Sequence, residues 1–155
     1  MQPFVQDIEK LLREENYIQI KPQGYSMYPV LIPGRDEVVV APVNAHTTLK
    51  RNDVVLYRRL KESGEKDILV LHRIWKVNDQ GIYLVGDNQT EIEGPLKREQ
   101  MLGIMVRFIR NGKVIEASNL MCRMLTGTWL WLRPMRPMIS KIASKIKGVF
   151  NHKKI

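Results

Sequence analysis

Cysteine is nearly absent from this sequence, and that absence limits both its fold and its chemistry. The single cysteine, Cys122, has no partner for an internal disulfide, so the fold does not depend on an oxidising compartment. One cysteine and three histidines at these spacings match no metal-binding pattern, and we expect neither a metal nor another cofactor. Internal repeats and low-complexity segments are also lacking, which excludes a repeat architecture.

A hydrophobic run long enough to cross a membrane is lacking too. Residues 1–16 carry acidic charge and have no continuous apolar core, so we expect neither a secretory signal nor a membrane span there. Residues 120–132 are mostly apolar but contain Arg123 and Gly127, and they fall short of the roughly 20 residues that a spanning helix needs. The 155 residues, 44% of them hydrophobic, are enough to build one core.

Acidic residues are missing from the last quarter of the chain. The formal net charge is +9, and no aspartate or glutamate follows Glu116. Eight basic residues lie in this quarter: Arg123, Arg133, Arg136, Lys141, Lys145, Lys147, Lys153 and Lys154. Such an asymmetry predicts a surface for an anionic partner, either a layer of lipid headgroups or nucleic acid.

The tail, residues 119–155, contains the pattern of a basic amphipathic helix. Apolar residues recur at i, i+3 and i+4 spacing over residues 138–150, with lysines between them. Trp129 and Trp131 precede this segment, and tryptophan suits the depth of lipid headgroups. We therefore predict a peripheral or monotopic protein whose tail binds an anionic membrane surface, on a side of the membrane that the sequence leaves open. The alternative is a helix packed on the rest of the fold.

Alternating residues and frequent turns ahead of the tail predict a mainly β fold. Residues 1–17 are the exception, because apolar side chains at helical spacing predict an amphipathic helix over residues 3–15. Strands are expected over residues 17–21, 37–41, 53–58, 68–77, 81–85, 102–110 and 113–116. Short strands with tight turns favour a compact antiparallel body over residues 18–118, either a coiled sheet or a barrel-like one.

Serine, histidine and aspartate follow one another in this β region, each on a short segment flanked by turns. Ser26 precedes Tyr28-Pro29, His72 lies in an apolar strand, and Asp87 follows Gly86 at the end of another. A serine hydroxyl is a poor nucleophile unless a base lies within hydrogen-bond reach, and a third group commonly orients that base. The order therefore indicates a nucleophile, a base and an orienting carboxylate.

These segments resemble the sequence boxes of the signal peptidase and self-cleaving repressor superfamily of serine peptidases. The similar segments span roughly residues 18 to 110. Ser26-Met27-x-Pro29 is similar to the nucleophile box, Leu71–Ile74 to the segment that carries the base, and Gly86-Asp87-Asn88 to the Gly-Asp-Asn box. Asn52–Leu56 is similar to a strand usually written Gly-Asp-hydrophobic-hydrophobic, and Pro95–Gly103 to the segment closing the catalytic sheet. A histidine at the base position, His72, is typical of the Ser/His branch, whereas bacterial type I signal peptidases and the repressors use lysine.

The resemblance implies a signal-peptidase catalytic core and a serine endopeptidase that removes a leader or signal segment from an exported or secreted peptide or preprotein. It implies that Ser26 attacks the scissile carbonyl, that its own N–H helps bind the oxyanion, and that His72 takes the proton. Asp87 would orient His72, or would only shape an Asx-type turn. Met27 and Tyr28 would line the substrate groove, with core packing as the alternative for Met27.

The sequence also departs from this family. Gly24 stands where some members have a serine that donates to the oxyanion, so no second donor can be named. Glu91 and Glu93 stand where further aspartates are common, and no membrane anchor is expected ahead of the serine. The alternative function is a non-catalytic peptide-binding or regulatory β-module with a basic membrane- or nucleic-acid-binding tail. Nucleic acid is the less favoured partner because no helix-turn-helix pattern precedes the β region, and no obligate protein partner is indicated.

Overall fold

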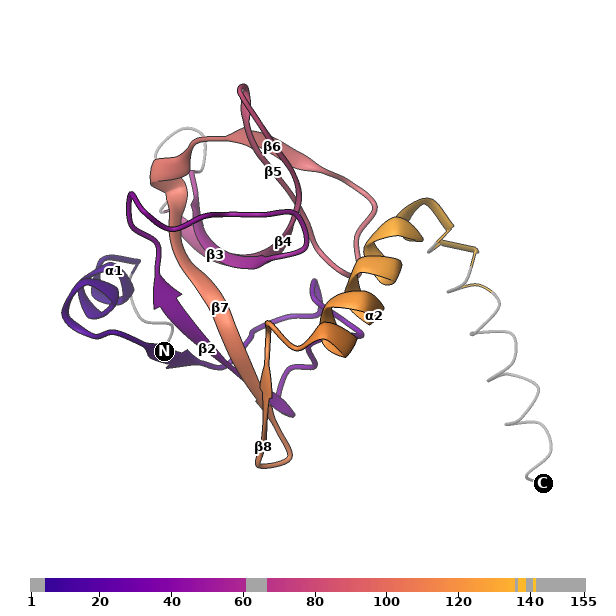
Figure 1. Cartoon of the computed structure of the whole chain (residues 1–155), viewed down its shortest axis with the longest axis horizontal. Helices are drawn as coiled ribbons and strands as arrows, with labels where there is room; N and C mark the ends of the chain where they lie inside the picture. Colours follow the sequence, from indigo (N-terminus) through magenta and orange to yellow (C-terminus); the bar gives the residue numbers. More distant parts are fainter. Residues whose placement is uncertain (1–4, 61–66, 136, 139–140, 142–155) are drawn as a thin grey trace.

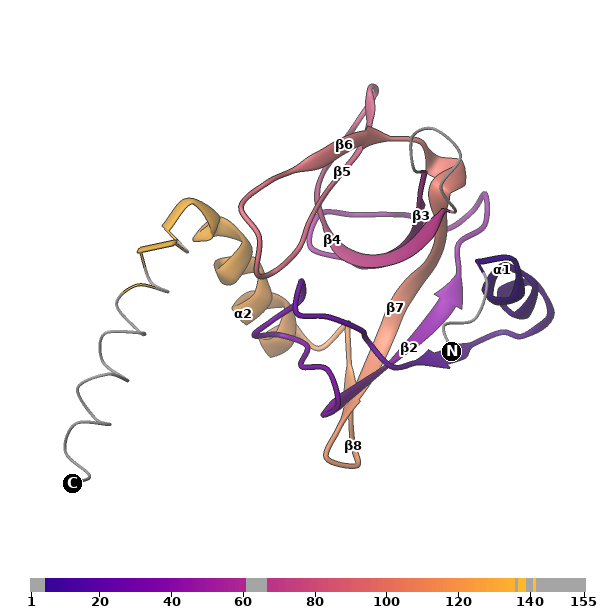
Figure 2. The same cartoon turned by 180° about the vertical axis from the view of Figure 1, so that it is seen from behind.

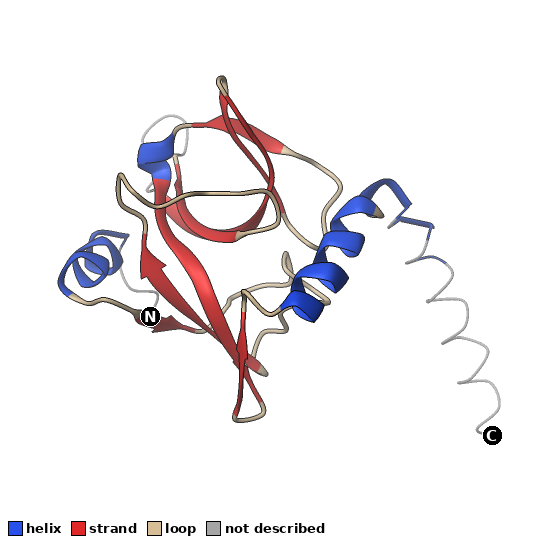
Figure 3. Ribbon diagram, in the orientation of Figure 1, coloured by secondary structure: helices blue, strands red, loops and turns tan. Residues whose placement is uncertain are grey.

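An open antiparallel β-sheet forms the body of the protein, as a computed structural model of residues 5–60, 67–135, 137–138 and 141 describes it (Figures 1 and 3). The elements are α1 (Val5–Glu14), β1 (Ile18–Ile20), β2 (Asp36–Pro42), β3 (Val54–Arg59), β4 (Ile68–Asn78), β5 (Gly81–Val85), β6 (Glu93–Leu96), η1 (Arg98–Gln100), β7 (Met101–Arg110), β8 (Lys113–Glu116), α2 (Leu120–Trp131) and η2 (Arg133–Met135).

The order of the strands shows that the sheet does not close. It runs β1-β2-β7-β3-β4-β5-β6, and β8 pairs with the far end of β7. Within the described chain the two edge strands, β1 and β6, do not pair with each other. The predicted mainly β, antiparallel fold is therefore confirmed, and the sheet is not closed into a barrel.

Most elements lie where the sequence pattern predicts them. The seven predicted strands agree with β1 to β5, β7 and β8 to within one residue at each end, and α1 lies inside the predicted helix 3–15. Strand β6 was not expected, because Gly94-Pro95 is a turn signal and proline has no N–H for a sheet. It is tolerated because β6 is an edge strand that pairs only with β5 among the described strands. The predicted helix over 138–150 lies outside the described residues, except for Met138 and Lys141.

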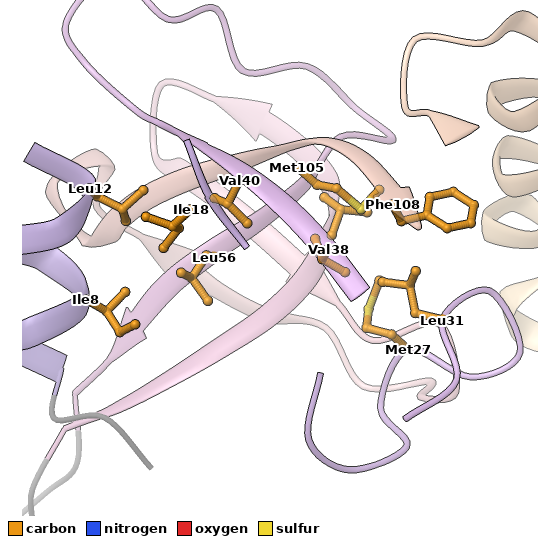
Figure 4. Packing of buried hydrophobic residues seen from close by; sticks show 11 residues of the cluster. Ile8, Leu12, Ile18, Met27, Leu31, Val38, Val40, Leu56, Met105 and Phe108 are labelled. Carbon is orange, nitrogen blue, oxygen red and sulfur yellow. The ribbon is translucent and has the colours of Figure 1, made fainter. Parts of the chain in front are cut away.

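The main core lies between α1, the sheet and the turn that carries Ser26 (Figure 4). Helix α1 supplies Ile8 and Leu12, which are four residues apart and so share one face. Val38 and Val40 of β2 fill the middle of this core, and Met27 and Leu31 enter it from the other end. Because Met27 is only 3% exposed, its burial fixes the backbone next to Ser26.

Helix α2 lies beside the sheet and is fastened to two of its loops (Figures 1 and 2). The indole Nε1 of Trp129 donates a 2.8 Å hydrogen bond to the carbonyl oxygen of Asp87, in the connection between β5 and β6. At the other end of the helix, Arg123 Nη1 donates to Asp53 Oδ1 at 2.9 Å, and Asn52 Nδ2 donates to the Arg123 carbonyl at 3.0 Å. None of the described helices is long and apolar enough to span a bilayer.

Candidate active site

Ser26 lies in a tight turn, as its sequence context predicts. The Tyr28 N–H donates to the Tyr25 carbonyl at 3.1 Å, and the Leu31 N–H donates to the Met27 carbonyl at 2.8 Å. The carbonyl of Ser26 itself accepts a 2.8 Å hydrogen bond from the Asn88 N–H. The serine turn and the Gly86-Asp87-Asn88 segment, 60 residues apart in sequence, are therefore in direct contact.

Gly86 permits this close approach. A Cβ atom at this position would lie 2.7 Å from the Ser26 carbonyl oxygen and 2.6 Å from Gln89 Oε1. Contacts this short are not found for real Cβ atoms, and the first involves a backbone atom that cannot simply rotate away. A residue without a side chain is thus required where the two predicted boxes meet.

Asp87 is held by an arginine. Both residues are buried, and the guanidinium of Arg73 donates from Nε to Asp87 Oδ1 at 2.8 Å and from Nη2 to Oδ2 at 2.6 Å. Arg73 Nη1 also donates to the carbonyl oxygen of Asn52 at 3.0 Å. The sequence left Asp87 as either the orienting carboxylate or a turn former. In the structure both of its carboxylate oxygens bind Arg73, and the polar contacts of His72 run to Tyr57 and Glu93 instead.

His72 precedes Arg73 on β4, so the two side chains point to opposite faces of the strand. The imidazole is buried, and its Nδ1 lies 3.5 Å from the hydroxyl of Tyr57 and 4.0 Å from Glu93 Oε2. Tyr57 OH donates to the same Glu93 oxygen at 2.5 Å. Arg59 donates from Nε to Glu93 Oε1 at 2.7 Å and from Nη2 to both Glu93 Oε2 and the Tyr57 hydroxyl.

This network favours one tautomer of His72. The single proton of the Tyr57 hydroxyl points to Glu93, so the hydroxyl can only accept from its other neighbours. It accepts from Arg59, and its remaining lone pair favours a proton on His72 Nδ1. The Nε2 atom of the ring then carries a free lone pair, which is the form that a general base requires.

The surroundings of His72 also favour its neutral form. Burial is the main cause, and together with the nearby positive charge of Arg59 it lowers the pKa of His72 from 6.5 to about 4, against the opposing effect of Glu93 and Asp87. Burial acts to raise the pKa of Glu93, but hydrogen bonds from Arg59 and Tyr57 outweigh it and lower that pKa overall. The carboxylate therefore stays charged beside an uncharged imidazole.

The predicted site residues are brought together only in part. Among the described residues, the polar contacts of the imidazole run to Tyr57 and Glu93, and no hydrogen bond joins it to Ser26. Met27 is buried in the core, which is the packing role that the sequence left open for it. Tyr28 is 41% exposed next to the serine and can contact a ligand. No group of three or more metal-ligating side chains occurs in the described parts of the chain.

Sequence reasoning missed most of the His72 network. Tyr57 and Arg59 alternate on β3 and thus share a face, but nothing local says that this face meets His72. Glu93 was noted only as an acidic residue after the Gly-Asp-Asn box. Glu93 reaches the network because β6 pairs with β5, and β6 is the strand that the sequence did not predict.

Comparison with known proteins adds no independent assignment: no protein-family model matches the chain, and neither curated proteins nor solved structures give a significant match. What the site can do therefore has to be argued from its own geometry.

Proposed function

We propose that this protein is a serine endopeptidase of signal-peptidase type, which removes a leader or signal segment from an exported or secreted peptide. In the proposed reaction Ser26 Oγ attacks the scissile carbonyl and passes its proton to His72 Nε2. The imidazolium returns that proton to the departing amine, and water then hydrolyses the acyl-enzyme by the same route. Apart from the substrate and this water, both steps use only groups of this chain.

The observation that carries the proposal is the contact between the serine turn and the segment after β5. Asn88 N–H binds the Ser26 carbonyl, and Gly86 is small enough to allow it. Val85, one residue earlier, pairs across the sheet with Arg73, the neighbour of His72. Three segments that are remote in sequence thus meet, and His72 is the chain neighbour of one of the paired residues. The hydrogen bond between them is absent here, but such bonds are often long in a free enzyme and tighten when substrate binds.

Glu93 takes the role of orienting carboxylate in this proposal, and Asp87 becomes a structural residue. A positioning group has to bind the imidazole nitrogen that does not face the nucleophile. Tyr57 and Glu93 both lie on the Nδ1 side of His72. Their hydrogen bond to each other, with Arg59 behind it, holds the ring and supplies negative charge near the imidazolium when it forms.

The resemblance to signal peptidases gains support from the backbone at Asn52. The family box has glycine at this position, and Asn52 has a φ of +78°, in the left-handed region. Glycine adopts that region freely, and asparagine is among the few other residues that tolerate it. Asn52 thus adopts a backbone conformation that a glycine at this position would adopt freely, although the residue type differs.

An extended peptide is the substrate form that the sheet favours. Strand β1 pairs only with β2 among the described strands, and the chain runs from β1 directly into the Ser26 turn. The unpaired side of an edge strand offers backbone N–H and C=O groups to an added strand. A leader segment bound in this way would approach Ser26 with its backbone extended.

The test is cleavage by the purified full-length chain. We expect Ser26→Ala and His72→Ala to abolish cleavage of leader-bearing peptides followed by mass spectrometry, and Ser26→Ala also to abolish labelling by a serine-directed fluorophosphonate. The exposed Ser118→Ala and His46→Ala are matched controls that should retain both. Peptide binding without cleavage or labelling by the unaltered protein would instead support the non-catalytic β-module.

A further inference from the structure

The outward side of α2 is lined by apolar side chains that nothing in the described structure covers. Leu120, Met121 and Trp131 are 74%, 71% and 70% exposed, and Met124 and Leu125 are 64% and 67% exposed. Single exposed apolar residues are ordinary, but several on one element mark a contact surface. These five residues are called the outer face of α2 below.

Helix geometry separates this outer face from the side of α2 that packs on the protein. At 3.6 residues per turn, the five residues fall within a sector of about 140°. The remaining sector carries the buried Thr126 and Leu130 and the half-buried Trp129. Both sides of the helix are therefore largely apolar, although the fold covers only one of them.

The charge of the chain after Glu116 favours one kind of partner for the outer face of α2. Arg123 is the only charged residue of α2, and it turns toward Asp53 and away from the outer face. No acidic residue follows Glu116, whereas eight basic residues do. An anionic bilayer offers negative headgroups above an apolar layer, which matches both features. Duplex DNA matches only the charge, and an apolar protein surface matches only the outer face.

Helix α2 is also coupled to the candidate active site. Its Trp129 holds the carbonyl of Asp87, whose neighbour Asn88 holds the carbonyl of Ser26. Near the other end of the helix, Asn52 binds both the Arg123 carbonyl and the guanidinium of Arg73. A surface that holds α2 is therefore linked to the serine turn through these hydrogen bonds.

We propose that the outer face of α2 docks on an anionic membrane surface and holds the Ser26 turn at a set height above it. The substrate class that follows is a peptide attached to the same membrane near its cleavage site. Docking is argued independently of catalysis, whereas the substrate class rests on the proposed peptidase function.

The first experiment measures docking alone, with the full-length protein and vesicles of phosphatidylglycerol and phosphatidylcholine. The double variant Met124→Glu/Leu125→Glu should lower flotation with these vesicles about tenfold or more, because it puts two negative charges on the outer face, against the anionic lipid surface. Val114→Glu is the matched control, since Val114 is an equally apolar residue, 58% exposed, on β8. It should float like the unaltered protein.

Tryptophan fluorescence gives a second measure of docking. Bromolipids in the same vesicles should quench the emission, and Trp131→Phe should remove most of that quenching. Trp75→Phe should leave it in place, because Trp75 is half-buried between the guanidinium groups of Arg51 and Arg133. Flotation that the double variant does not weaken would overturn the proposal. Loss of a self-associated dimer in the double variant, without flotation of the parent, would assign the face to a second copy.

A third experiment separates docking from catalysis. Ser26→Ala should float as the unaltered protein does, because Ser26 is not part of the outer face. The double variant should cleave a lipid-tethered peptide at least several-fold more slowly, and a soluble peptide of the same sequence at the usual rate. Flotation with no cleavage of either peptide would refute the peptidase and leave docking intact. Equal loss on both peptides would refute the link between docking and substrate.

Discussion

His72 and Arg73 are neighbours on β4 and equally buried, at 2% exposure each, yet they differ in charge and in how closely they are paired. Arg73 keeps its charge and is matched by a complete carboxylate, that of Asp87, in a two-bond pair. His72 is only within loose reach of Tyr57 and Glu93, and its pKa is lowered to about 4 so that it is uncharged at neutral pH.

The difference separates structural from chemical use of a buried polar group. A permanent charge taken out of water needs a full partner, and the pair then becomes costly to break. A group that must take up and release a proton cannot be held so tightly, because it has to be stable in both states. In the proposed function, the Arg73 side of β4 is therefore the framework side and the His72 side is the reactive side.

The largest expected effect comes from breaking the framework side. Arg73→Met should lower the free energy of unfolding by about 3–5 kcal/mol, because it leaves the carboxylate of the fully buried Asp87 without a counter-charge. Urea denaturation at pH 7 measures this loss. His72→Gln should cost less than half as much, since it leaves no charge unpaired.

A double-mutant cycle sharpens this first prediction. Arg73→Met combined with Asp87→Leu removes both charges. The double variant should therefore lose clearly less free energy of unfolding than the two single variants lose in sum. Equal losses for Arg73→Met and His72→Gln would show that the two positions are not used differently.

The second prediction uses pH to isolate His72. Its folded pKa of about 4 lies below its ordinary value of 6.5, so its neutral ring stabilises the fold fully above pH 6.5. That contribution is lost as the pH falls from 6.5 to about 4, and the loss should be on the order of 3 kcal/mol over this range. Unfolding free energies of the parent and of His72→Gln, measured from pH 8 to pH 4, should converge as the pH decreases.

His46→Gln is the control for this titration, because His46 is exposed. A parent curve that stays parallel to that of His72→Gln would mean that His72 is not kept neutral by burial.

The third prediction concerns Gly86, which ties the framework side to the serine. Gly86→Ala should displace the Ser26 carbonyl, lower stability by about 1–3 kcal/mol and reduce cleavage by up to about a hundredfold. Gly127→Ala is the matched control, since a Cβ there would meet only Asn52 Nδ2, at an ordinary 3.6 Å. Thermal unfolding and cleavage rates measure both variants; unchanged cleavage in Gly86→Ala would separate the serine turn from the site.

The same contrast explains how far the sequence could predict the molecule. Local patterns were enough to predict seven strands and the Ser26 turn. The alternation of side chains and the choice of turn residues depend only on a few neighbouring positions. The partners of His72 and Asp87 depend instead on strand pairing across the sheet. The pairing of Asp87 with Arg73 can be recognised only once the strands are paired. The role of Glu93 could not be predicted because Gly94-Pro95 is a turn signal within β6, so that strand was not expected.

The smallest expected effect comes from the reactive side, where Tyr57→Phe removes one hydroxyl and keeps the buried ring. Glu93 retains its bonds from Arg59, so stability should fall by only about 1 kcal/mol. Cleavage should slow about tenfold, because His72 Nδ1 loses the acceptor that favours its proton on this nitrogen. The charges around the ring are unchanged, so the acid limb of the kcat/KM profile should keep its position.

Arg59→Gln is the contrasting variant, because it changes charge. The positive charge of Arg59 lowers the pKa of His72, and Glu93 opposes it. Without Arg59 the pKa of His72 should rise from about 4 toward 6.5, and the acid limb of kcat/KM should move to higher pH by the same amount. A limb that moves in Tyr57→Phe but not in Arg59→Gln would mean that Tyr57, rather than the pair of charges behind it, sets the basicity of His72.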